Sequence, residues 1–160
     1  MKLNTHISVG VGVASLLPSL VGCEMLCFAL SIVLGGAVHG IVDQLSHEWR
    51  GGTIRRGPLL HSVEGSLALS LLLTALLAVL PIPLSLLSWV VVFFSTWASL
   101  LSHLLLDSLT PAGVYFGGRN VSLASFRYDS PELNGFFSLL GLALFLFSLL
   151  NYLKYLPAGP

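Results

Sequence analysis

The sequence has very few charged side chains for its length of 160 residues. Asp, Glu, Lys and Arg together make up 9% of it, whereas soluble domains carry about 25%. Seven basic and seven acidic residues balance, so the chain lacks the excess of positive charge that favours nucleic-acid binding. Hydrophobic residues make up 55%, and the mean hydropathy is +0.91. This composition predicts an integral protein of the cell membrane that contacts membrane lipid and does not bind nucleic acid.

Cysteines are also scarce. The two that are present, Cys23 and Cys27, are four residues apart and do not form the pattern of a disulfide framework. We interpret both as small buried hydrophobic residues. The N-terminus lacks the positive cluster of a secretory signal peptide, because Lys2 is its only basic residue. The first apolar stretch is therefore predicted to be retained as a membrane segment.

Long apolar segments dominate the rest of the chain. A spanning helix needs about 20 mostly apolar residues. Val63–Leu80 is slightly short but rich in leucine, and Ile7–Gly22 reaches only about 24 Å at about 1.5 Å per residue. We predict an all-α fold, a polytopic membrane bundle of about five transmembrane helices that forms one integral domain over residues 1–160. The three segments that meet the length criterion well are Cys23–Val42, Leu84–Leu106 and Gly135–Leu153.

The charged residues gather in two polar loops, residues 42–62 and 107–133. One helical hairpin separates these loops, so both are expected on the same side of the membrane. The excess of arginine predicts that this side is cytoplasmic and that the C-terminus is outside. Arg50–Pro58 is predicted to be a glycine-rich turn. Gly117–Gly135 is longer than most connections, and its aromatic residues favour docking on the bundle over disorder.

Histidines and aspartates concentrate near the cytoplasmic ends of the predicted helices. On a helix, residues four apart differ by about 40° in direction, so His103 and Asp107 share one face. An imidazole and a carboxylate so placed are typical ligands of zinc and other divalent metals. Asp43 directly follows the second predicted segment and Asp107 directly follows the fourth, so both carboxylates are expected at the cytoplasmic surface. The five histidines are His6, His39, His47, His61 and His103.

Simpler roles remain open for each of these residues. His103 and Asp107 can hydrogen-bond each other, and Asp43 can be a helix-end carboxylate without a metal. His6 can lie at the interface near Lys2. The same reasoning makes His39 and His47 neighbours of the ligands instead of ligands, His39 as a packed histidine and His47 in a solvated loop.

Arginines on the same predicted face indicate a substrate with a phosphate group, because guanidinium forks bind phosphate in a bidentate manner. We expect Arg55, Arg56 and Arg127 to bind the substrate. Membrane topology and anionic lipid headgroups explain the same arginines without a substrate. Glu64, three residues after His61, is either a catalytic base or ligand or a first-turn charge that interacts with the helix dipole.

Several short motifs together resemble an archaeal family of uncharacterised small membrane proteins. That family is similar to LexA-binding, inner-membrane-associated proteins named as metal-dependent hydrolases. The resemblance covers nearly the whole chain. The motifs that carry it are Asn4–His6, Asp43 with His47-Glu48, Arg55–Pro58 with His61-Ser62, Ser102–Thr110 with its SHxxxD pattern, Arg127–Asp129 and Leu133–Gly135.

A more distant similarity links the order Asp, His, HisxxxAsp to zinc-dependent phospholipase C and the α-helical single-strand nucleases. This resemblance implies a metal site of Asp43, His61, His103 and Asp107, with His6 in a neighbouring site. Those enzymes carry a later HxxxE pair, and no histidine follows His103 here, so the resemblance implies one or two metal ions.

These observations predict a membrane-embedded, metal-dependent hydrolase that acts on a phosphoester at the headgroup level, with His6 as a further ligand or general base. A non-enzymatic membrane protein is the alternative, either a metal or proton carrier or a scaffold for a cytoplasmic partner with a structural metal. Ser, Thr and Gly are the polar residues in the middle of the apolar segments, which favours a surface-facing site over a conduit.

Overall fold

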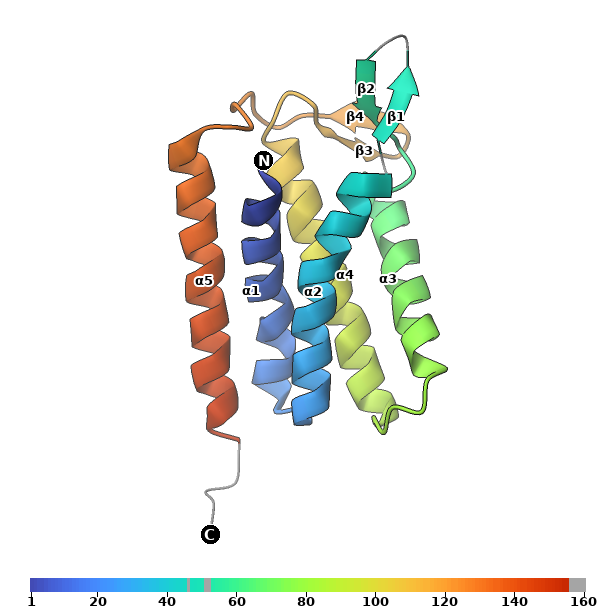
Figure 1. The fold of residues 1–160 in the computed structure, drawn as a ribbon, viewed down its shortest axis with the longest axis vertical. Coiled ribbons are helices and arrows are strands. Elements are labelled where there is room, and N and C mark those ends of the chain that lie inside the picture. The colour runs from blue at the N-terminus through green and yellow to red at the C-terminus, as the bar shows by residue number, and fades with distance from the viewer. Residues whose placement is uncertain (46, 51–52, 156–160) are drawn as a thin grey trace.

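The computed structural model describes residues 1–45, 47–50 and 53–155, without the side chains of residues 47–50 and 53–56. Its helices run alternately down and up in one bundle (Figure 1). The N-terminus and two small hairpins lie at one end, which we call the hairpin end, and the C-terminal segment lies at the other. This arrangement confirms the predicted all-α bundle. The helices are α1 (Leu3–Val21), α2 (Met25–Leu45), α3 (Val63–Ala78), α4 (Leu86–Ser108) and α5 (Pro131–Leu153).

Four of the helices, α1, α2, α4 and α5, are long and apolar enough to cross a membrane. The first segment, expected to be short, begins before His6 and reaches 19 residues. The short helix is α3, whose 16 residues span only about 24 Å. The chain therefore has the composition and helix lengths of a membrane protein, with α3 as a shorter apolar helix.

Local sequence signals explain where the helices begin and end. Ser62, Ser85 and Ser130 precede α3, α4 and α5, and each side chain accepts a hydrogen bond from the backbone three residues later. Such caps satisfy N–H groups that have no partner within the helix. At the other end of α1, Gly22 has a φ of 63°, a left-handed conformation that favours glycine.

Both polar loops contain a β-hairpin, which the sequence analysis did not predict. β1 (His47–Arg50) pairs with β2 (Thr53–Arg56), and β3 (Val114–Phe116) pairs with β4 (Arg119–Val121). In the second hairpin, Gly117 and Gly118 form the two-residue turn with φ of 54° and 77°, a conformation that suits such turns. The segment Arg50–Pro58, expected to be a glycine-rich turn, contains strand β2, and its residues 51 and 52 lie outside the described residues.

The second loop docks on the end of α4, as its length and composition predicted. Leu123 N donates to Ser108 O at 2.7 Å, and Phe126 N donates to Leu109 O at 3.0 Å. These carbonyls are among those that a helix end leaves without an internal partner. The loop therefore caps α4 through its backbone.

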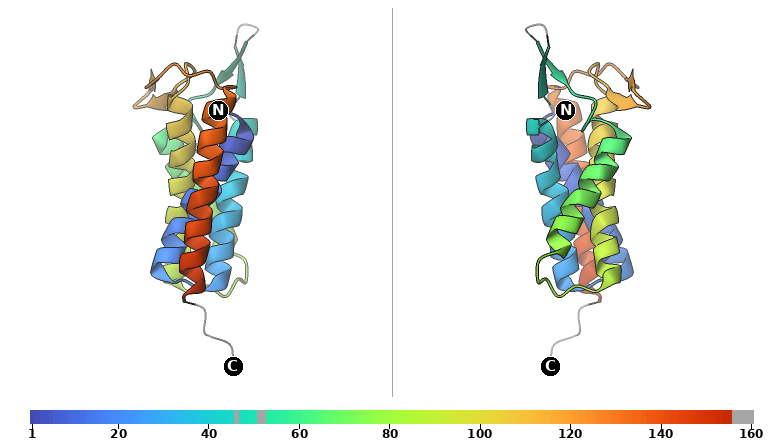
Figure 2. Two further views of the ribbon diagram at one scale, coloured as in Figure 1. Left: turned by 90° about the vertical axis from the view of Figure 1, so that its left-hand side faces the viewer. Right: turned by 90° about the vertical axis from the view of Figure 1, so that its right-hand side faces the viewer.

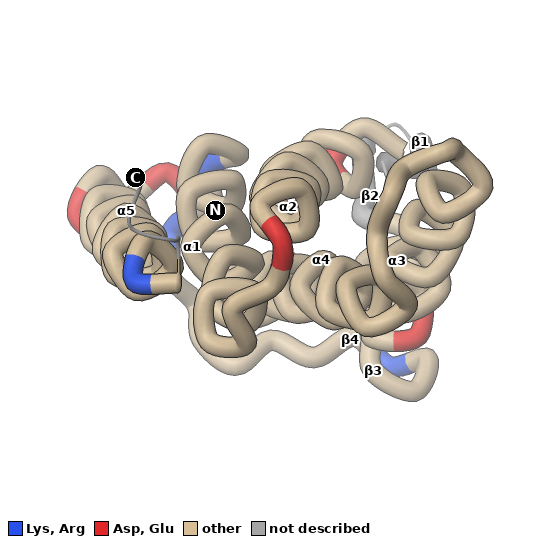
Figure 3. Tube along the Cα trace, turned by 90° about the horizontal axis from the view of Figure 1, so that it is seen from below, with Lys and Arg blue, Asp and Glu red and all other residues tan. Residues whose placement is uncertain are grey.

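Helix α1 lies at the centre of the bundle and packs against α2, α4 and α5. Seen along the helices, α5 lies outside α1, and α3 lies on the far side of α4 (Figure 3). Glycines allow α1 and α5 to approach closely. A Cβ atom at Gly141 would collide with the backbone of Ser8, and one at Gly12 would collide with the carbonyl of Gly141. Close crossings at small residues are typical of helix pairs in membranes.

We predict that Gly141→Ala destabilises the bundle by about 1–3 kcal/mol, because the backbone of α1 must move away from the new methyl group. The matched control is Gly135→Ala on the same helix, where a Cβ meets no atom within 4 Å. The control should be neutral or should stabilise by up to about 1 kcal/mol through helix propensity. Unfolding of both variants in detergent measures the difference, and equal stabilities would contradict the close crossing.

Candidate metal centre

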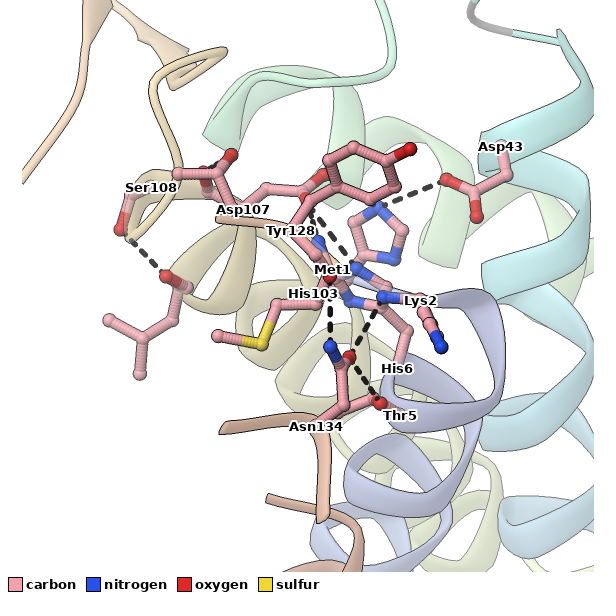
Figure 4. Close-up of polar contacts among 12 residues, drawn as sticks. Met1, Lys2, Thr5, His6, Asp43, His103, Asp107, Ser108, Tyr128 and Asn134 are labelled. Atoms are coloured by element: carbon pink, nitrogen blue, oxygen red, sulfur yellow. Dashed lines mark hydrogen bonds and ion pairs between the residues drawn. The ribbon is translucent and has the colours of Figure 1, made fainter. Parts of the chain in front are cut away.

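The predicted ligands come from four separate elements and meet at the hairpin end of the bundle (Figure 4). Both His103 and Asp107 lie in the last two turns of α4, and His61 directly precedes the N-cap residue of α3. These three residues, with His6 of α1, are at most 1% exposed. The side chain of Asp43, near the end of α2, is 26% exposed.

The carboxylate of Asp107 is the centre of this cluster. Its Oδ1 atom lies 3.2 Å from His6 Nε2 and 3.2 Å from the Met1 amino group. Its Oδ2 atom lies 3.3 Å from His61 Nε2 and 3.3 Å from His103 Nε2. One carboxylate thus faces three imidazoles from three different elements, and its two oxygens point to different sides of the cluster.

A second carboxylate completes a set of four potential ligands. Asp43 Oδ1 lies 3.6 Å from His103 Nε2, and one ligand atom each of Asp43, His61 and His103 fall within 4.8 Å of one another. Ligands at about 2.0–2.1 Å from a tetrahedral zinc ion are about 3.3 Å apart. The separations of 3.3 Å for His61–Asp107 and His103–Asp107 and of 3.6 Å for His103–Asp43, three of the six pairs in this set, are close to this value. N–H···O hydrogen bonds usually have shorter N···O distances, about 2.9–3.0 Å. The longer distances in this cluster are those expected between metal ligands, so these groups can hold a divalent metal ion.

A chain of hydrogen bonds orients the imidazole of His103. The hydroxyl of Ser99 donates to Gly35 O at 2.8 Å, so its oxygen can accept from His39 Nε2 at 3.0 Å. When His39 is neutral, its Nδ1 atom then accepts from His103 Nδ1, 2.9 Å away. This tautomer leaves the Nε2 lone pair of His103 facing Asp43 and Asp107. Within the described residues His103 Nε2 makes no hydrogen bond, as expected of a ligand atom.

A second group of possible ligand atoms, from His6, His39 and His103, also falls within 4.8 Å. The three rings stack, with centroids of His6 and His103 4.1 Å apart and those of His39 and His103 5.1 Å apart. Both nitrogens of His39 already have partners in Ser99 and His103. His39 therefore contacts His103 through a hydrogen bond, and we take the group of Asp43, His61 and His103 as the candidate metal site.

Further residues, not identified as site residues from the sequence, hold the ligands in place. Tyr115 N in β3 donates to His61 O at 2.7 Å, and Thr110 Oγ1 donates to Asp107 O at 2.8 Å. Asn134 of α5 accepts from Thr5 Oγ1 at 2.7 Å and so anchors the turn of α1 that carries His6. A buried asparagine in an apolar helix is a signal that could have identified the last contact.

Asn134 uses its whole amide group. Its oxygen also accepts from Lys2 N at 3.0 Å, and its nitrogen donates to the carbonyls of Tyr128 and Ser130 at 2.9 and 2.7 Å (Figure 4). The side chain thus ties α5 and the segment before it to the beginning of α1. Because His6 directly follows Thr5 in α1, these contacts of Asn134 also fix the position of His6 in the cluster.

The site opens to its surroundings at Asp43. The break in the chain after α4, at residues 110–113, does not expose the cluster. Thr110 is 2% exposed and Asp107 0%, because the second loop covers the end of α4. Of the four proposed ligands, Asp43 alone is accessible, on the side of α2 from which the β1–β2 hairpin rises (Figure 1).

The remaining predicted site residues lie outside the cluster, or their side chains are not among those that the structure describes. Arg127 is 83% exposed and forms a two-bond pair with Asp129, whose pKa the arginine lowers. Glu64 lies in the first turn of α3 and is absent from the converging groups found among the described residues. The side chains of His47, Arg55 and Arg56 lie outside the described residues.

The fold and the site together define an apolar helical bundle of the membrane type with buried histidine and aspartate groups that can hold a metal ion. The chain belongs to the family described as "Protein of unknown function (DUF1286)", whose model matches residues 1–106. The match includes His6, Asp43, His61 and His103 and ends one residue before Asp107. Neither a curated protein nor a solved structure matches the chain.

We predict that Gly10→Ala weakens metal binding without removing a ligand. A Cβ atom at Gly10 would collide with the ring of His39 and would displace it from His103. Loss of a hydrogen bond that orients a ligand reduces metal affinity about 10–100-fold. Titration of the purified protein against a chelating dye measures the change. Ser99→Ala, which adds no bulk, should act in the same direction.

Gly40→Ala is the matched control for this experiment. It lies next to His39 on α2, and a Cβ there meets no atom within 4 Å. Its metal affinity should equal that of the wild type. Unchanged affinity in the Gly10 and Ser99 variants would show that the contact of His39 does not orient His103.

Proposed function

We propose that the protein is a membrane-embedded hydrolase that depends on a divalent metal, zinc in one or two ions, and cleaves a phosphoester at the headgroup level. The observation that carries this proposal is the set of separations near 3.3 Å among His61, His103 and the two aspartates. Two imidazoles and two carboxylates form a ligand set that suits zinc. The resemblance to metal-dependent hydrolases and to zinc-dependent phospholipase C supports the same chemistry.

A bound divalent ion would supply hydroxide near neutral pH by lowering the pKa of a water molecule. The role of the chain is to hold the ligands rigidly and to leave one open side. His61, His103 and Asp107 are buried, whereas Asp43 is partly exposed and faces the direction from which a substrate can approach. His6, beside the other oxygen of Asp107, is positioned to accept a proton through Asp107 or to bind a second ion.

The arginines of β2, Arg55 and Arg56, are proposed to bind the substrate phosphate. The β1–β2 hairpin follows α2 directly, only a few residues after Asp43. Arg127 fits this role less well, because its guanidinium is already paired with Asp129. For Glu64, the first-turn position favours an interaction with the helix dipole over catalysis.

The second candidate function is a carrier or a scaffold with a structural metal. A carrier needs polar groups along the bundle, and the hydroxyls of Ser31 and Ser95 are buried there without partners among the described residues. These hydroxyls carry no charge, and the four buried or partly buried imidazoles His6, His39, His61 and His103 gather with Asp43 and Asp107 at the hairpin end, while Glu24 lies at the other end. This distribution favours a site that works at one surface. A scaffold would bind metal and hydrolyse nothing.

We predict that both polar loops face the cytoplasm and that the C-terminal end faces outward, because the loops carry five arginines. Single cysteines at Ser122 and Lys154, in a background without Cys23 and Cys27, can be labelled with an impermeant reagent. The two positions should react from opposite sides of the membrane. Reaction of both from one side would contradict the five-segment topology.

Replacing Asp107 by Asn tests the proposed function directly. The amide has nearly the same size but lacks the charge that a divalent ion needs. We expect the variant to remain folded in detergent, to lose bound metal in elemental analysis and to lose hydrolysis of a model phosphodiester. If this variant retained a full complement of metal, His103 and Asp107 would be only a hydrogen-bonded pair at the end of the helix.

Leu105→Ala is the control from the same turn. Its side chain is 58% exposed and points away from the cluster, so metal content and hydrolysis should remain at wild-type levels. Wild-type protein with metal but without hydrolysis of any phosphoester would favour the scaffold.

A further inference from the structure

The second hairpin lies in a different direction from the first. β1–β2 stands away from the helices along the long axis of the bundle (Figure 1). In the two side views, β3–β4 extends sideways beyond α4 (Figure 2), and the view along the helices places it outside the outline of α3 and α4 (Figure 3). In a membrane, this sideways extension lies above lipid that surrounds α4. We call residues 114–128 the lateral segment.

Large apolar side chains of the lateral segment are exposed. Exposure is 64% for Phe116, 66% for Leu123 and 63% for Tyr128, and Phe126 is 45% exposed. Clusters of exposed apolar residues on one surface mark a contact with a membrane or a protein. Exposure of these apolar side chains to water is unfavourable, whereas aromatic residues are enriched at the interface between a membrane and water.

The lateral segment is attached to the end of a helix that exposes apolar side chains. Leu123 N and Phe126 N donate to the carbonyls of Ser108 and Leu109, and Leu105, one turn earlier on α4, is 58% exposed. Attachment beside an exposed apolar side chain of a membrane-type helix favours lipid over a soluble protein as the partner of the lateral segment.

The backbone and the charges of the segment also suit the headgroup layer. Leu123 N and Phe126 N already donate to carbonyls of α4, and Ser122 Oγ donates to Thr110 O at 2.8 Å. A chain with its polar groups satisfied tolerates the loss of water near lipid. The lateral segment contains two arginines, Arg119 and Arg127, and no Asp or Glu. Arg127 is paired with Asp129, which directly follows the segment, so Arg119 is the arginine that can bind a lipid phosphate.

We propose that the lateral segment lies in the headgroup layer of the membrane and binds lipid through Phe116, Leu123 and Arg119. Because Tyr115 N binds His61 O, the same segment sets the depth of the candidate metal site relative to the lipid phosphates. The lipid contact itself does not depend on the proposed hydrolase activity. If that activity holds, its substrate is a phosphoester of a membrane lipid and not a soluble compound.

Spin labels on single cysteines test this contact in the full chain. The protein is reconstituted into vesicles of phosphatidylcholine and phosphatidylglycerol, and labels replace Phe116 or Leu123. Collision rates with oxygen and with an aqueous nickel chelate report the depth of each label. Leu139 on α5, which is 68% exposed, provides the lipid control, and a free spin label in buffer provides the control for water.

We expect both labels of the lateral segment to lie between these controls, with fewer nickel collisions than the free label in buffer. Arg119→Gln should move the Phe116 label toward the aqueous value. Full aqueous accessibility of Phe116 and Leu123 in these vesicles, which contain no other protein, would overturn the proposal and would leave a protein as the partner of this surface. The experiment measures neither metal nor hydrolysis, so its failure is separate from a failure of the Asp107→Asn test.

Discussion

The structure depends on a buried carboxylate at the end of an apolar helix. Asp107 is fully buried, and an isolated charge there would cost several kcal/mol. Its environment compensates for this cost with groups from three other parts of the chain, His6 of α1, His61 before α3 and the Met1 amino group. Each partner must reach the same point, so Asp107 constrains the relative positions of α1, α3 and α4 at the hairpin end.

The segment around Asp107 meets the demands of packing and of chemistry in successive residues. Leu104 and Leu106 are buried, Leu105 is exposed, and His103 and Asp107 face the cluster one turn apart. A single helix can therefore present ligands to the interior and leucine to lipid. Thr110 and the second loop then close the end of α4. This cover keeps the site dry on the α4 side and leaves Asp43 as its accessible edge.

The sequence predicted the bundle and the proximity of His103 to Asp107, because apolar length and the spacing of His103 and Asp107 are local signals. It could not predict contacts made across the bundle. The polar residues at the start of α1 suggested a late beginning for that helix, yet Thr5 and His6 are buried by Asn134 and Asp107. The opening at Asp43 likewise depends on distant partners, because the second loop covers the end of α4 and leaves Asp43 as the accessible side chain of the cluster.

The metal geometry also requires three helices to approach more closely than large side chains would allow. Gly10 of α1 leaves room for the ring of His39, and a Cβ atom at Gly35 of α2 would collide with Ala14. Ser99 of α4 fits in the same layer and bonds to both Gly35 and His39. Small residues that allow tight packing within a membrane therefore also determine which nitrogen of His103 faces the carboxylates. A substitution at Gly10, Gly35 or Ser99 consequently changes the packing of the bundle and the proposed chemistry together.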